Sequence, residues 1–236
     1  MIKGLTDIGL LRELNEDNYF FSEDGDNFVI AVADGMGGHN AGDKASDITV
    51  SAIKKFSEEN DMYTDSEKKI RLAVLKANED VFKESVSDKS KNGMGATVVV
   101  AVGTKDEAVI GNIGDSRCYI ADSEHIEQIT EDHSYVNELV KSGMITEDEA
   151  RFHPRKNEIL KAVGIGGDVF PDIFRVRLKE GDMLLLCTDG LTNMLTDSEI
   201  HEILKSDNSA LETAKALIDA ANNAGGTDNI TVVLKK

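Results

Sequence analysis

Aspartates that adjoin glycines recur at the borders of apolar segments, and they are the residues best suited to chemistry. Asp34 and Asp189 each follow an apolar run and precede a glycine, Asp228 opens the last apolar run, and Asp115 lies in a turn between two others. An acid and a glycine at a strand end place a carboxylate at a sheet edge and let a ligand approach the backbone. The simpler interpretation of each is ordinary turn chemistry, with Asp34 capping a following helix.

Four carboxylates brought together by the fold would repel one another unless cations lay between them. Oxygen ligands without cysteine or paired histidine favour Mg²⁺ or Mn²⁺ over Zn²⁺. Two such ions about 4 Å apart can activate a water and steady the oxygens of an in-line displacement at phosphorus. Arg12, Glu16 and Asp17 could line the same cleft, or they could brace one another as a surface cluster.

Composition restricts the class of protein. The 236 residues include 44 acidic and 26 basic ones, and the net charge of −18 argues against nucleic-acid and anionic-membrane partners. The N-terminus lacks a signal-peptide core and no segment approaches 18 apolar residues, so a cytoplasmic location is expected. Cys118 and Cys187 lie in apolar runs, which is typical of buried free thiols in a reducing compartment.

Hydrophobic periodicity predicts the elements that must position the acids. Apolar runs rich in β-branched residues indicate strands, and apolar residues at helical spacing indicate helices. Short turns after residues 102 and 113 favour antiparallel pairing of the strands around them. Residues 130 to 170 show weak periodicity and high charge, which indicates a mobile excursion that handles substrate. Strands are expected at 28–33, 97–102, 107–113, 117–121, 173–178, 183–187 and 230–234, and helices at 41–57, 66–86, 135–141, shortly before 152, after Thr196 and at 209–222.

Eight short segments in this order resemble the bacterial branch of the metal-dependent protein phosphatases (the PPM, or protein phosphatase 2C, family). A phosphate-binding loop of the GxxxxGK[ST] type is missing, which removes the commonest nucleotide-binding alternative. The segments are Thr6 to Gly9, Arg12 with Asn15 to Asp17, Ala33 to Gly42, Gly95 to Thr97, Gly111 to Arg117, Thr130 to Ser134, Thr188 to Leu191, and Gly226 to Val233.

The resemblance implies an α+β fold: a four-layer αββα sandwich in which two central antiparallel sheets are flanked by helix pairs. One phosphatase domain would span residues 1–236, with a flap at about 132–165 that tunes substrate access. Relatives often have an arginine and a leucine before the flap glycine, whereas this chain has Lys161-Ala162-Val163-Gly164. This departure bears on the contacts of the flap and not on the metal site.

The resemblance also implies that seven residues serve metal ions. Asp34 would bridge two ions, with the Gly35 carbonyl on one of them. Asp189 and Asp228 would complete the coordination of the other ion. Glu16 and Asp17 would act mostly through metal-bound waters, and Asp115 would help to hold a third, weaker ion.

Two residues would handle the substrate itself. Arg12 would bind the phosphate, because its planar guanidinium group, with paired N–H donors, suits a phosphate better than the ammonium group of a lysine. His39 would be the general acid for the leaving oxygen, in keeping with a pKa near neutrality, unless it is simply a loop histidine bonded to the backbone. Asn229 would support Asp228 from behind.

The function implied is metal-dependent hydrolysis of phosphoserine and phosphothreonine in proteins, by a water or hydroxide activated at a binuclear Mn²⁺ or Mg²⁺ centre. The expected partners are phosphorylated proteins, namely a Ser/Thr protein kinase and its substrates, and the chain is expected to be a monomer. Two alternatives stay open. One is a catalytically silent module of the same fold that binds phosphoproteins, and the other is a phosphatase for phosphotyrosine or small phosphometabolites.

Overall fold

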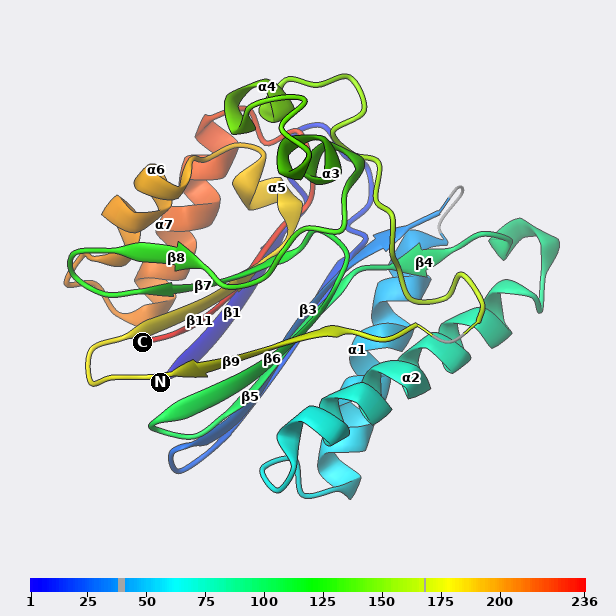
Figure 1. Cartoon of the computed structure of the whole chain (residues 1–236), viewed down its shortest axis with the longest axis horizontal. Coiled ribbons are helices and arrows are strands. Elements are labelled where there is room, and N and C mark those ends of the chain that lie inside the picture. Colours follow the sequence, from blue (N-terminus) through cyan, green and yellow to red (C-terminus); the bar gives the residue numbers. More distant parts are fainter. Residues whose placement is uncertain (38–40, 168) are drawn as a thin grey trace.

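The computed structural model describes residues 1–37, 41–167 and 169–236. Two antiparallel sheets pack face to face, and helices cover the outer face of each (Figure 1). This is the predicted α+β, four-layer αββα sandwich. Within the ranges described, no helix is long and apolar enough to cross a membrane.

All strand pairs in both sheets are antiparallel. The first sheet has the order β1 (Ile2–Asp7), β11 (Ile230–Lys235), β10 (Met183–Cys187), β7 (Arg117–Ala121) and β8 (Ile126–Gln128). The second has the order β2 (Asp17–Asp24), β3 (Asn27–Met36), β5 (Val98–Gly103), β6 (Glu107–Ile113) and β9 (Asp172–Arg177), and β4 (Gly95–Ala96) pairs with β3.

The helices divide between the two outer faces and one end of the sandwich. The second sheet is covered by α1 (Gly42–Glu59) and α2 (Ser66–Ser85), which a short 3₁₀ turn, η1 (Lys89–Lys91), follows. The first sheet is covered by α5 (Asp189–Thr192), α6 (Asp197–Leu204) and α7 (Ala210–Asn223). The two flap helices, α3 (Tyr135–Lys141) and α4 (Glu147–Arg151), lie across the end of the sandwich (Figure 1).

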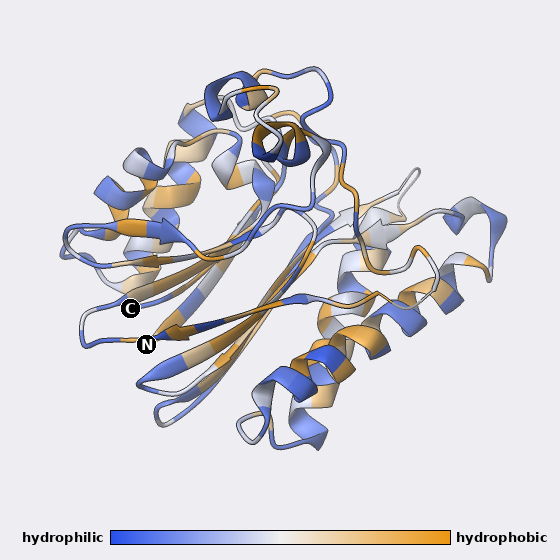
Figure 2. Cartoon of the chain, viewed as in Figure 1, coloured by the Kyte–Doolittle hydropathy of each residue, from blue (hydrophilic) through white to orange (hydrophobic). Residues whose placement is uncertain are grey.

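Burial of the strands on both faces explains their continuous apolar runs. Along β3, Phe28, Ile30 and Val32 point into the core between the sheets, whereas Val29 and Ala31 point toward α1 and α2. The period of two along a strand sends alternate side chains to these two cores. The strands are accordingly coloured apolar along much of their length, and the helices carry an apolar and a polar side (Figure 2).

The two cysteines are buried and unpaired, as expected. Cys118 lies in the core between the sheets, and Cys187 lies in the core under α5, α6 and α7. Because burial raises the pKa of both thiols well above the ordinary value, they are not poised to react.

The expected pairing of three consecutive strands is correct for the first two and wrong for the third. β5 and β6 pair as predicted, but β7 pairs with β10 in the other sheet. The turn from Gly114 to Ser116 therefore carries the chain from one sheet to the other. Strands β1, β2 and β8 were not predicted, because β1 and β2 mix polar with apolar residues and β8 has only three residues.

Leu186 tests the core between the sheets, where its side chain is fully buried. We expect Leu186→Ala to lower the free energy of unfolding by about 2–5 kcal/mol, measured by urea denaturation, because a cavity replaces the lost methyl groups. The matched control is Leu72→Ala on α2, where the side chain is 42% exposed and a change within about 0.5 kcal/mol is expected. Equal losses at both positions would contradict this description of the core.

Candidate active site

The structure brings four of the predicted acids to one end of the sandwich, where strands of the two sheets approach each other. Asp17 opens β2 and lies opposite Asp34 of β3 in the ladder. Asp189 opens α5 directly after β10, and Asp228 lies just before β11, both on the other sheet. The Thr188 hydroxyl joins the sheets here by donating to Asp17 Oδ2 at 2.8 Å.

Asp34 does not end its strand, and it is not a helix cap. β3 runs on to Met36 and pairs there with β4, while α1 begins only at Gly42 and has no side-chain cap. The strand continues because the Asp34 peptide is bonded on both sides: its N–H donates to Thr97 Oγ1 at 2.9 Å, and its carbonyl accepts from the Thr97 N–H at 2.8 Å. The carboxylate is thus anchored within a ladder and not on a turn.

Gly35 is in close contact with two other segments, and only glycine fits there. A Cβ at Gly35 would lie 1.9 Å from the Gly42 carbonyl oxygen, and one at Gly42 would lie 2.3 Å from Glu16 Oε1 and 2.7 Å from the Gly35 oxygen. The Gly35 N–H also donates to the Glu16 carbonyl at 3.0 Å. The Gly35 carbonyl and the Glu16 carboxylate therefore lie close to each other beside Asp34.

Asn229 holds the loop that carries Arg12. Its Nδ2 donates to the carbonyls of Ile8 and Leu14, both at 2.9 Å, and its Oδ1 accepts from the Glu16 N–H at 2.8 Å. One buried amide therefore fixes both ends of this loop against β11.

Arg12 extends from that loop to the acids. Its Nη2 donates to Asp228 Oδ2 at 2.8 Å, and its Nη1 lies 3.8 Å from Glu16 Oε2. The side chain remains 44% exposed, so part of the guanidinium faces the solvent from which a substrate would arrive. Arg12 and Glu16 therefore lie beside an acid that precedes β11 of the first sheet, and they are more than a surface cluster of neighbours in sequence.

Burial raises the pKa of the clustered acids, and the charges of neighbouring carboxylates add to the rise. The pKa of Asp17 is raised to about 7 and that of Asp189 to about 6. The pKa values of Asp34 and Asp115 are raised well above the ordinary value for the same two reasons. The negative charges of Asp17 and Asp189 are the largest charge contributions to the raised pKa of Asp34, so these three carboxylates interact across the two sheets.

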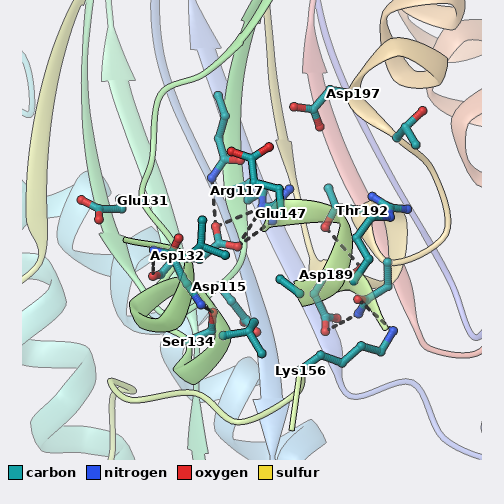
Figure 3. A pocket seen from close by; sticks show the side chains of 18 of the residues that line it. Asp115, Arg117, Glu131, Asp132, Ser134, Glu147, Lys156, Asp189, Thr192 and Asp197 are labelled. Carbon is teal, nitrogen blue, oxygen red and sulfur yellow. Dashed lines mark hydrogen bonds and ion pairs between the residues drawn. The ribbon is translucent and has the colours of Figure 1, made fainter. Parts of the chain in front are cut away.

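A cavity of about 570 Å³ opens beside Asp189, between α5 and α6 on one side and the flap helices on the other (Figure 3). Asp115 lies on its wall in the turn after β6, and only 8% of this residue is exposed. Lys156 of the flap lines the cavity near Asp189 and donates to Asn193 Oδ1 at 3.3 Å. Asn193 in turn donates from Nδ2 to Asp189 Oδ2 at 2.8 Å, which connects the flap to the acids.

Sequence reasoning did not assign roles to Thr188, Asn193 or Lys156. The spacing of Asp189 and Asn193, four residues apart at the start of a helix, could have indicated their contact. Lys156 carries no such signal because its partner is 37 positions away. The predicted general acid, His39, lies outside the described residues.

The donor set fits hard divalent cations. It consists of carboxylates with one nearby backbone carbonyl, and Asp189 Oδ1 is buried without a hydrogen-bond partner. In the part of the chain that the structure describes, no three His, Cys, Asp or Glu side chains are already gathered at metal-ligand spacing. Cations between the carboxylates would replace the protons that the acids now hold and would remove their repulsion.

Similarity to known proteins extends over nearly the whole chain. The model of the family described as "Protein phosphatase 2C" matches residues 12–228. The serine/threonine phosphatase stp of Listeria welshimeri is 43% identical over 233 residues, which cover 97% of this chain and 92% of the relative.

Solved structures of bacterial serine/threonine phosphatases have the same fold as this chain. The serine/threonine phosphatase Stp1 from Staphylococcus aureus matches with a TM-score of 0.94 at 36% identity, covering 99% of this chain and 93% of that one. The catalytic domain of the serine threonine protein phosphatase PstP, in complex with 2 manganese ions, matches with a TM-score of 0.89 at 32% identity and covers 99% and 96%.

The raised pKa values predict how the stability of the metal-free protein depends on pH. Folded Asp17 and Asp189 hold protons up to about pH 7 and 6, whereas unfolded aspartates lose them near pH 4. The folded state binds more protons between these values, so its stability falls as pH rises. We expect urea denaturation in EDTA to show a loss of about 1–3 kcal/mol between pH 5 and pH 8.

Asp34→Asn is the control for this pH dependence, because it removes one of the interacting charges and should flatten the profile. A free energy of unfolding that rises from pH 5 to pH 8 in the metal-free wild type would contradict the assigned repulsion.

Proposed function

The chain belongs to the protein phosphatase 2C family, and from this membership we propose that its cluster of buried acids is a binuclear metal centre that hydrolyses phosphoserine and phosphothreonine in proteins. The enzyme class follows from relatives over nearly the full length, which are serine/threonine phosphatases. The observation that carries the proposal is the meeting of buried acids from both sheets beside an exposed arginine.

Seven residues are proposed to hold the ions. Asp34 is the proposed shared ligand, because its carboxylate interacts with the charges of Asp17 on its own sheet and of Asp189 on the other. When bound, Mn²⁺ or Mg²⁺ ions would supply Lewis acidity and an activated water for attack at phosphorus. The manganese complex of PstP supports Mn²⁺. The proposed ligands are Asp34, Gly35 through its carbonyl, Asp189 and Asp228, with Glu16 and Asp17 through waters and Asp115 for a third, weaker ion.

Arg12 is proposed to bind the substrate phosphate. A guanidinium offers two parallel N–H donors to a phosphate, and the bond to Asp228 fixes the orientation of Arg12 before substrate arrives. His39 is proposed as the general acid that protonates the leaving serine or threonine oxygen. The buried Asn229 fixes the loop of Arg12, so the phosphate-binding group and the acids keep one geometry.

The rest of the molecule is assigned as follows. Residues 1–236 form one phosphatase domain whose flap, at about 132–165, controls access to the cavity beside Asp189. The enzyme acts as a monomer and opposes a bacterial Ser/Thr kinase. The buried free thiols support a reducing compartment, the cytoplasm, as its location.

Phosphate release from a phosphothreonine peptide tests this proposal. Release is expected with Mn²⁺ or Mg²⁺ and not with EDTA, and Asp34→Asn should lower kcat by a factor of about 1,000 or more because the shared ligand loses its charge. Thermal unfolding of the metal-free variant should show that the fold persists. Turnover in EDTA, or full activity of Asp34→Asn, would overturn the metal centre, and activity confined to phosphotyrosine would overturn the substrate class.

Arg12→Ala tests the phosphate site separately. Since a charge-assisted hydrogen bond contributes about 1.5–3 kcal/mol, we expect KM to rise about tenfold or more while kcat changes by less. The KM of Arg12→Lys should lie between those of the wild type and Arg12→Ala, because lysine keeps the charge but loses the paired donors. A KM equal to that of the wild type in Arg12→Ala would exclude this role.

A further inference from the structure

His133 holds the turn that carries Asp115. The residue is 9% exposed and lies at the root of the flap, just before α3. Its backbone N–H donates to the Gly114 carbonyl at 2.9 Å, and its imidazole Nδ1 accepts from the Gly114 N–H at 3.1 Å. Both polar backbone groups of Gly114 are therefore bonded to a single residue.

Gly114 is a point at which the backbone cannot easily adjust. Its φ is +105°, and a Cβ there would lie 2.5 Å from Thr97 Cγ2. Asn112 adds a second bond to the Gly114 carbonyl, from Nδ2 at 3.3 Å. Because Asp115 follows directly, the direction of its buried side chain depends on how this peptide is held.

The hydrogen bonds of His133 define its tautomer. Since Nδ1 accepts from an N–H it carries no proton, and we assign the proton to Nε2. Nε2 lies 3.1 Å from Asp172 Oδ2, which accepts that proton's hydrogen bond. Asp172 Oδ1 accepts from Lys161 Nζ at 3.2 Å.

Asp172 is kept as an acceptor. Burial of its carboxyl opposes ionisation, but the hydrogen bonds from His133 and Lys161 outweigh this and hold the pKa of Asp172 below its ordinary value. The acid lies at the first residue of β9, opposite Asn112 of β6 in the ladder. Lys161 belongs to the returning arm of the flap, so both arms meet at this acid and this histidine.

We propose that His133 is a positioning residue for the third cation site: its unprotonated Nδ1 holds the Gly114 N–H, and thereby keeps Asp115 beside Asp189 while the flap is docked through Lys161 and Asp172. This inference rests on the proposed role of Asp115 in binding a cation. In this proposal the imidazole of His133 connects the flap to that site: its Nε2–H bonds to Asp172, and its Nδ1 bonds to the Gly114 N–H.

Two amide variants separate the two nitrogens. His133→Asn keeps an acceptor near the Nδ1 position and loses the group at Nε2, whereas His133→Gln keeps a donor near Nε2 and loses the acceptor at Nδ1. Calorimetric titration of the metal-free protein with Mn²⁺ measures the weakest binding event directly. We expect its dissociation constant to stay within about twofold in His133→Asn and to rise about tenfold in His133→Gln, as for the loss of one buried hydrogen bond.

Thermal unfolding supplies the control. Each variant loses one hydrogen bond, so both should lower Tm by similar amounts, and a histidine that served only stability would change Mn²⁺ binding equally in both. Equal Mn²⁺ dissociation constants for His133→Asn and His133→Gln would overturn the proposal.

A second measurement separates this inference from the proposed metal role of Asp115. If Asp115→Ala binds Mn²⁺ as the wild type does, the third cation site itself is refuted. The ¹⁵N spectrum of labelled histidine still tests the hydrogen bonds, since the proposal requires His133 to carry its proton on Nε2. A proton on Nδ1 would overturn the positioning role whatever the result for Asp115.

Discussion

Repulsion among carboxylates buried where the two sheets meet is the constraint on which the rest of the structure depends. Burial and proximity raise the pKa values of Asp17, Asp34 and Asp189, so without cations these groups keep protons that free aspartates would lose. Side chains supply little compensation: Arg12 bonds to Asp228 at the rim, and Lys156 reaches Asp189 only through an asparagine. A protein with a net charge of −18 that concentrates acids in this way is suited to divalent ions from solution.

Carboxylates that repel one another stay close only if the surrounding structure holds them rigidly. Here polar side chains hold the backbone that carries these groups: the Thr97 hydroxyl bonds to the Asp34 N–H, and the Asn229 amide bonds to the loop of Arg12. Gly35 has no room for any side chain. Because the acids come from both sheets, the core between the sheets sets their spacing. If cations bind these acids as proposed, the repulsion lowers the stability of the metal-free state and cation binding restores it, which would couple metal binding to folding.

The sequence predicted the elements whose signal is local. Continuous apolar runs identified β3, β5, β6, β10 and β11, because burial on both faces removes polar residues from a strand. The mixed β1 and β2 were missed, and the pairing of β7 with β10 was not foreseen, since sheet membership depends on contacts between distant segments. The acids of the candidate site were found through motifs and family resemblance. The bonds of His133, Asn193 and Lys156 were not, because each joins residues that sequence spacing does not relate or that lie far apart along the chain.

The path of the chain explains why flap and metal site should communicate. The flap leaves after β8, a strand of the first sheet, and returns into β9, a strand of the second. The turn from Gly114 to Ser116 crosses between the sheets in the opposite direction, from β6 to β7, in three residues. Both connections therefore span one junction, and His133 bonds to Gly114 on one side and to Asp172 on the other. In the proposed coupling, a change in how the flap docks acts through His133 on the Gly114 peptide, and the next residue along the chain is Asp115.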